Sequence, residues 1–161
     1  MRDRIDEIVA QWQRERPDVD PRPMELVGRI QRAAAALRPR LDEVHSASGL
    51  VGESFDVLAA LRRSAPPHQL TPTELYRQMM LTSGAMTNRI DRLEESGYVE
   101  RKADPSDRRG TLVKLTPKGR VLIDSALEKH VTNEKHLLTA LSVKEQQQLN
   151  RLLRKLLLTL D

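Results

Sequence analysis

The most basic stretch of the chain runs from residue 101 to residue 120. It holds seven basic and two acidic residues, whereas the whole chain of 161 residues has a net charge of only +4. A solvated basic loop is one explanation, and a polyanionic partner is the other. Arg108 and Arg109 follow Pro105 in a tight turn, from which guanidinium groups can enter a narrow minor groove of DNA. We therefore assign Arg108 and Arg109 to DNA contact, and Asp107 to positioning the turn.

A polar helix face precedes this basic segment. In a helix over residues 83–96, Met86, Ile90 and Leu93 share one face and are expected to pack inward. Short hydroxyl, amide and guanidinium groups near the N-terminus of a helix suit phosphate oxygens and base edges in the major groove. An ordinary solvated face is the alternative, and the basic segment that follows disfavours it. The residues assigned to DNA contact here are Thr82, Ser83, Ala85, Thr87, Asn88 and Arg92.

Helix-start and helix-stop signals make this helix the second of a pair. Residues 71–74 (TPTE) combine an N-cap, a proline at the first helical position and a glutamate at the third. They predict a helix that runs to about Met80. Residues 82–84 (TSG) interrupt the chain, and Gly97 ends the second helix. Two helices joined by such a short turn form a helix-turn-helix.

The segment after Gly97 is extended and predicts a β-hairpin wing. Its strands are expected at residues 98–102 and 111–116, on either side of a loop with the sequence ADPSDRRG. Upstream, the apolar run FDVLAAL predicts a short third helix. The apolar seam before it predicts a long second helix, which Pro39 should kink or break near Arg38.

Amphipathic helices are expected at both ends of the chain. Ile5, Ile8, Val9 and Trp12 recur at helical spacing and form an apolar face. Residues 116–138 predict another helix, and a capping box at Ser142 begins a leucine-rich last one. A small lobe cannot cover so many leucines, which suggests a subunit interface. We expect a mainly α fold with a small β-hairpin wing: dimerisation helices at 1–48 and 121–161, and a winged helix-turn-helix lobe at 49–120.

Several classes of protein and site are disfavoured. The chain has no cysteine, its four histidines lack metal-ligand spacing, and we find no phosphate loop or nucleophile motif. We therefore expect no enzyme, catalytic residue, metal or cofactor. The chain has neither a signal peptide nor an apolar run long enough to span a bilayer, so we expect a cytoplasmic protein without a membrane partner.

From the third helix through the wing, the sequence resembles the MarR family of winged-helix regulators. The resemblance is carried by FDVLAALRR, LTPTELYRQMMLTSGAMTNRIDRLEESGYVERKADPSDRRG and TLVKLTPKGR. It includes Asp107 and Arg109 in the wing and the LTPKG start of the next helix. The resemblance implies a homodimer, formed through the terminal helices, that binds palindromic double-stranded DNA.

Four further residues raise the question of a ligand. Asp56 lies in an apolar run, where a carboxylate needs a cation or hydrogen-bond donors. Arg89 lies on the flank of the helix predicted over residues 83–96. Arg101 shares a strand face with Val99. Both are therefore expected to point toward the dimerisation helices. Trp12 offers a flat apolar surface with one donor. Each also has an ordinary interpretation. Trp12 could pack in the interface, Asp56 could form a cap or a salt bridge, and the two arginines could contact phosphate.

Together, Trp12, Asp56, Arg89 and Arg101 are similar to the signature of the urate-responsive branch of the family. This resemblance implies an anionic ligand between the dimerisation region and the DNA-binding lobe, because two arginines favour an anion. A purine such as urate or xanthine is the first choice, and a citrate-like or aconitate-like carboxylate is the second. The expected function is a repressor that releases its operator on binding this ligand. The alternative is a winged-helix DNA-binding or protein-interaction module without small-molecule sensing.

Overall fold

The computed structural model describes the chain except for residues 1, 52, 80–85 and 161, and except for the side chains of Arg108 and Arg109. Its described part is mainly helical with one small antiparallel sheet, which confirms the expected fold class. The chain divides into two compact units, Met1–Leu41 and Asp42–Asp161, and each is described by itself.

The first unit pairs α1 (Arg4–Glu15) with the beginning of α2 (Arg22–Ala47). The carboxylate of Asp3 caps α1 by accepting hydrogen bonds from the backbone N–H groups of Ile5 and Asp6. Ile5 is buried, and its Cδ1 lies only 3.0 Å from where a Cβ on Gly28 would be. A glycine at this point therefore lets the two helices approach closely.

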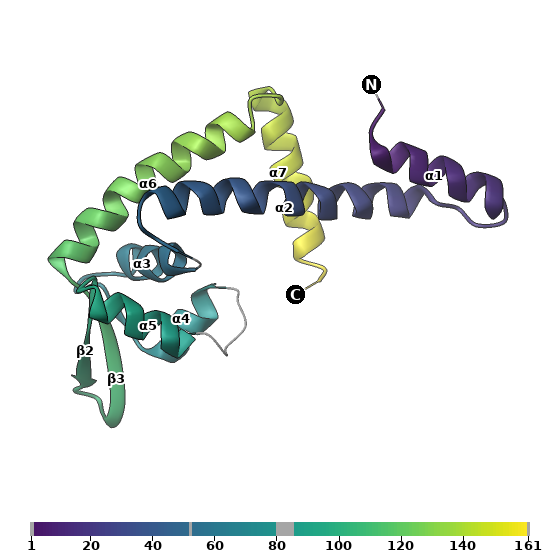
Figure 1. The fold of residues 1–161 in the computed structure, drawn as a ribbon. Coiled ribbons are helices and arrows are strands. Elements are labelled where there is room, and N and C mark those ends of the chain that lie inside the picture. The colour runs from purple at the N-terminus through teal and green to yellow at the C-terminus, as the bar shows by residue number, and fades with distance from the viewer. Residues whose placement is uncertain (1, 52, 80–85, 161) are drawn as a thin grey trace. The chain divides into compact units, whose positions relative to one another are not determined.

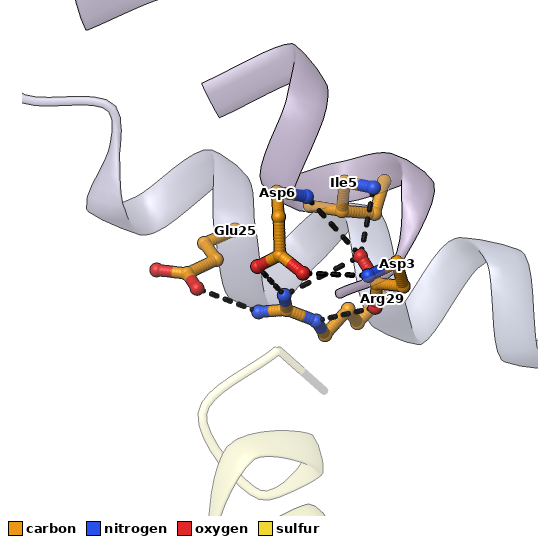
Figure 2. Close-up of polar contacts among 5 residues, drawn as sticks. All are labelled: Asp3, Ile5, Asp6, Glu25 and Arg29. Carbon is orange, nitrogen blue, oxygen red and sulfur yellow. Dashed lines mark hydrogen bonds and ion pairs between the residues drawn. The ribbon is translucent and has the colours of Figure 1, made fainter. Parts of the chain in front are cut away.

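One arginine joins these two helices electrostatically (Figure 2). The guanidinium of Arg29 pairs with Asp3 at 2.8 Å, with Asp6 at 2.6 Å and with Glu25 at 2.8 Å. Hydrogen bonding to Asp3, and then to Glu25, raises the pKa of Arg29, and the same arginine lowers the pKa of Asp3. The carboxylate of Asp3 therefore serves both the cap of α1 and its attachment to α2.

The helix α2 continues through Pro39, so of the kink or break predicted near Arg38, the break does not occur. A proline in a helix removes one N–H donor and leaves one carbonyl without its usual partner. The surrounding residues 38–40 are exposed, so water can reach the backbone. The carbonyl that loses its partner is that of Ala35. The guanidinium of Arg40 donates a 2.6 Å hydrogen bond to the neighbouring carbonyl of Ala36.

The second unit has one hydrophobic core. Around it lie α3 (Ser54–Arg63), α4 (Pro72–Met79), α5 (Met86–Glu95) and the first half of α6 (Pro117–Leu137). The largest side chains that are almost completely buried are Leu50, Leu58, Leu61, Leu75, Ile90, Ile123, Val57, Val99 and Val113. The α3 prediction is confirmed, and so is the start of α4, where Thr71 and Glu74 form the predicted capping box.

The sheet has three strands rather than the predicted two. It consists of β1 (Gln69–Leu70), β2 (Val99–Asp104) and β3 (Asp107–Leu115) in the order β1-β3-β2. The predicted loop over residues 103–110 is wrong, because only Pro105 and Ser106 separate the paired strands. Arg108 and Arg109 therefore belong to β3, in the hairpin that extends away from the helices in Figure 1.

The end of α5 is fastened to the start of α6. Gly97 adopts a left-handed φ of 72°, as predicted for a helix C-cap. The hydroxyl of Thr116 donates a 2.8 Å hydrogen bond to the carbonyl of Gly97, and the ammonium of Lys118 donates one of 2.9 Å to the carbonyl of Ser96. These contacts fix where α5 ends relative to the sheet.

The last helix, α7 (Val143–Leu157), follows α6 in the same unit (Figure 1). The capping box of Ser142 and Glu145 is present as predicted. Every residue of α7 remains at least partly exposed in the single chain, including Leu149 at 43%, Leu152 at 52% and Leu157 at 52%. The leucine-rich face is therefore not covered by the described residues of the second unit.

Candidate DNA interface and ligand pocket

The predicted recognition helix, α5, has the two faces that its sequence predicts. Met86, Ile90 and Leu93 are buried in the core. Thr87 and Asn88 lie on the other side and are exposed. Buried anchors at helical spacing hold α5 on the lobe, so its polar side chains are presented to solvent, where a DNA groove can receive them.

Most of the predicted DNA contacts fall outside the described side chains. Thr82, Ser83 and Ala85 lie outside the described residues. Arg108 and Arg109 lie in β3, but the described structure does not extend to their side chains. The backbone places both arginines close to the hairpin turn, because Asp104 pairs with Asp107 in the register of the two strands.

Asp104 organises the wing turn, a role that the sequence analysis missed. Its carboxylate accepts hydrogen bonds from the Ser106 backbone N–H at 2.8 Å and from the Ser106 hydroxyl at 2.7 Å. The Ser106 hydroxyl and then the Ser106 N–H lower the pKa of Asp104. The sequence DPS carries this signal, because an aspartate two residues before an N–H donor commonly forms such a turn.

Arg101 lies against the recognition helix and not in an open anion site. Its guanidinium pairs with Asp91 at 2.5 Å and also with Glu94, both on α5. Partial burial lowers the pKa of Arg101, but the bonds to Asp91 and Glu94 outweigh this effect and raise it overall. The backbone N–H of Arg101 also donates a 2.8 Å hydrogen bond to the carboxylate of Glu94. We call Arg101, Asp91 and Glu94 the wing clamp, since they connect β2 to α5.

Arg89 also pairs with a carboxylate. Its Nη2 lies 2.6 Å from Oε2 of Glu53, the residue that precedes α3. The Arg89 side chain is only 16% exposed. Its Nη1 is buried and has no hydrogen-bond partner among the residues that the structure describes. Because a buried guanidinium nitrogen without a partner is costly, Arg89 is suited to donate a hydrogen bond to one more anionic oxygen.

The other two predicted ligand residues lie on α3 and α1. Asp56 is partly buried in the first turn of α3, in the same unit as Arg89 and Arg101. Trp12 lies on α1 in the first unit and is 46% exposed. Asp56, Arg89 and Arg101 therefore belong to one unit, and Trp12 belongs to the other.

A histidine pair connects α6 to the end of α2, and the sequence analysis missed it. The Nε2 of His45 lies 3.0 Å from Nδ1 of His130, and the His45 ring stacks on Phe55 with centroids 4.0 Å apart. The Nε2 of His130 lies 3.1 Å from Glu134. The two histidines are 85 residues apart, so no local spacing could identify them.

None of the helices in the described residues could span a membrane. Within the same residues, no group of three or more histidine, aspartate or glutamate side chains is placed to hold a metal ion.

Comparison with known proteins identifies the family. The MarR family model matches residues 48–110. The HTH-type transcriptional regulator PecS of Dickeya dadantii is 37% identical over 149 residues, which cover 92% of this chain and 90% of PecS. The crystal structure of a mutant of E. coli MarR complexed with operator DNA superposes with a TM-score of 0.72 at 29% identity, covering 91% of this chain and 97% of that one. Sco3205 of Streptomyces coelicolor, also solved in complex with DNA, has a TM-score of 0.74 at 28% identity, covering 85% and 87%.

These relatives are transcriptional regulators and not enzymes. The match extends over nearly the whole chain, including the helices outside the winged lobe. It agrees with the buried and exposed faces of α5 and with the hairpin beside it. The chain therefore belongs to the MarR family of DNA-binding transcriptional regulators.

Proposed function

We propose that the protein is a repressor that binds a palindromic operator as a homodimer and releases it when a small organic anion binds. The ligand response is supported by the burial and the partners of the Arg89 side chain. This residue belongs to the helix predicted to read DNA, yet its guanidinium is mostly buried, holds a carboxylate and has one nitrogen without a described partner. An anion at Arg89 would therefore act directly on the recognition helix.

The homodimer is supported by the uncovered apolar face of α7. Partly exposed leucines on one terminal helix would be buried efficiently by a second copy of the chain. We assign residues 1–48 and 121–161 to this interface and residues 49–120 to DNA binding. A two-fold dimer places its two recognition helices about one DNA turn apart, so the half-sites should repeat at roughly 10 bp.

Release follows because the anion and DNA would both act on α5. An anion bound by Arg89 would draw this residue away from Glu53 and repel nearby carboxylates, including the predicted ligand residue Asp56. A small shift of α5 suffices, because both recognition helices of a dimer must match their half-sites together. By linkage, the factor by which ligand weakens DNA binding equals the factor by which DNA weakens ligand binding, typically about 5 to 150.

The preferred ligand is a purine such as urate or xanthine, and the second choice is a citrate-like or aconitate-like carboxylate. Selection from random DNA would first supply a high-affinity duplex. The affinity of the full chain for this duplex would then be measured with and without urate, xanthine and citrate. We expect at least one anion to weaken binding by about fivefold or more. Equal affinity under all conditions would reject the ligand response.

The four predicted ligand residues are tested in the same assay. Trp12→Phe and Arg101→Ala should reduce the ligand response more than DNA affinity, whereas Asp56→Asn and Arg89→Ala should change the response most strongly. If all four variants respond as the native protein does, these residues do not form the ligand site. If neither the variants nor the native protein respond, the chain is a winged-helix DNA-binding module without small-molecule sensing. The pairing of Arg101 with two carboxylates favours this alternative.

A further inference from the structure

A pocket of about 380 Å³ lies between the beginning of α3 and the outer flank of α5. This volume is within the range of roughly 300 to 1,000 Å³ that small-molecule sites occupy. The polar residues that line it are Glu53 and Ser54 at the start of α3, Arg89, Arg92 and Ser96 on or just after α5, and Tyr98 before β2. All of them belong to the second unit, so the pocket lies within one lobe.

The side chains that line this pocket carry an excess of positive charge. Two arginines, Arg89 and Arg92, line it together with one carboxylate, and Arg89 pairs with that carboxylate, Glu53, at 2.6 Å. The buried Nη1 of Arg89 still has no partner among the described residues. An oxyanion in the pocket would balance the charge of Arg92 and could take the place of Glu53 on Arg89.

Arg101 is not among the residues that line the pocket. Both of its carboxylate partners, Asp91 and Glu94, lie on α5, so its positive charge is already matched. An anion that bound Arg101 directly would have to displace two carboxylates. The same anion in the pocket would displace at most one, Glu53, so the pocket is the more favourable place for it.

We infer that this pocket binds the effector anion through Arg89 and Arg92, with Glu53 as a built-in competitor that occupies Arg89 in the ligand-free state. The inference rests on the proposed ligand response and specifies its site. The ligand class is a small organic anion, and the hydroxyl groups of Ser54, Ser96 and Tyr98 can supply further hydrogen bonds. Arg101 acts through α5 as a positioning residue.

Two substitutions in the pocket should move affinity in opposite directions. Glu53→Gln removes the competing charge but keeps the shape, and a partly exposed ion pair of this kind corresponds to about a fivefold effect on binding. We therefore expect Glu53→Gln to bind the anion about fivefold more tightly. Arg92→Gln removes a charge-assisted contact and should weaken binding by about tenfold or more.

The experiment is calorimetric titration of the full chain with urate and with citrate in the absence of DNA. Glu15→Gln and Lys135→Gln serve as matched controls, because each makes the same change of charge at an exposed position outside the pocket lining. Circular dichroism checks that every variant is folded. A gain of affinity in Glu53→Gln is the stronger result, because a misfolded variant cannot produce it.

The outcomes separate the pocket from the proposed function. Affinities of both pocket variants within about twofold of their controls would overturn the inference, even where an anion still releases DNA from the native chain. Absence of binding by the native chain to either anion would overturn it as well. If the variants shift as expected but neither anion changes DNA affinity, the pocket is supported and the proposed release mechanism fails.

Discussion

Breaking the wing clamp should destabilise the protein by a measurable amount. Arg101→Met keeps most of the apolar stem and removes the charge, so the ion pairs to Asp91 and Glu94 are lost. The side chains are 31% exposed for Arg101, 45% for Asp91 and 36% for Glu94. Because solvent screens pairs with this exposure, each is worth about 0.5 to 1 kcal/mol. We expect the free energy of unfolding to fall by about 1 to 2 kcal/mol at neutral pH.

The pH dependence of this loss follows from Glu94. The backbone N–H of Arg101, and then its guanidinium, lower the pKa of Glu94 below its ordinary value of 4.5. A carboxylate with a lowered pKa adds stability that is fully present above its ordinary value and is lost as the pH falls through the lowered one. The difference between the native protein and Arg101→Met should therefore be largest near neutral pH and shrink below about pH 4.

Urea denaturation of the native protein, Arg101→Met, Glu94→Gln and the double variant would measure the Arg101–Glu94 coupling. We expect a coupling of about 0.5 to 1 kcal/mol that decreases in about 1 M salt. A change in unfolding free energy of less than about 0.3 kcal/mol in Arg101→Met, or simple additivity of the two substitutions, would show that the ion pair does not stabilise the fold.

Four further substitutions test the contact between Gly119 and Tyr98 and the DNA interface. Gly119→Ala should cost about 3 kcal/mol of unfolding free energy, because its Cβ would overlap the Tyr98 carbonyl; a midpoint in urea equal to that of the native protein would contradict this. Arg108→Ala and Arg109→Ala should each weaken binding to all DNA sequences and reduce the slope of log affinity against log salt concentration by about one unit. An unchanged slope would contradict the phosphate contact. Asn88→Ala should relax base preference at one operator position at a cost of about 1 to 3 kcal/mol; a binding-site selection with unchanged preference would reject base reading by Asn88.

Local signals in the sequence predict most of the helices. The capping boxes at Thr71 and Ser142 depend on groups three residues apart, so their chemistry is visible in a short window. The same holds for Gly97, whose place after an apolar periodic segment indicates a helix C-cap. The strand β1 is different, because two residues become a strand only by pairing with β3, which lies far along the chain.

The candidate site was less predictable because its contacts also join segments that are far apart in the sequence. The residue types of Arg89 and Arg101 indicate anion binding, but their nearest carboxylates decide how each arginine is used. Glu53 lies on a distant segment before α3 and has no pattern that marks it as a partner of Arg89. Asp91 and Glu94 lie on the predicted DNA-reading helix, where acidic residues suggest a solvated face rather than a clamp to the wing.

Two copies of the chain should read one palindromic duplex. This is tested by sedimentation of the full chain with a duplex from random-sequence selection, together with a titration against a scrambled duplex of the same length. We predict two chains per duplex, and a dissociation constant at physiological salt about 10³-fold or more lower for the selected than for the scrambled sequence. One chain per duplex, or equal affinity for the two sequences, would contradict the account.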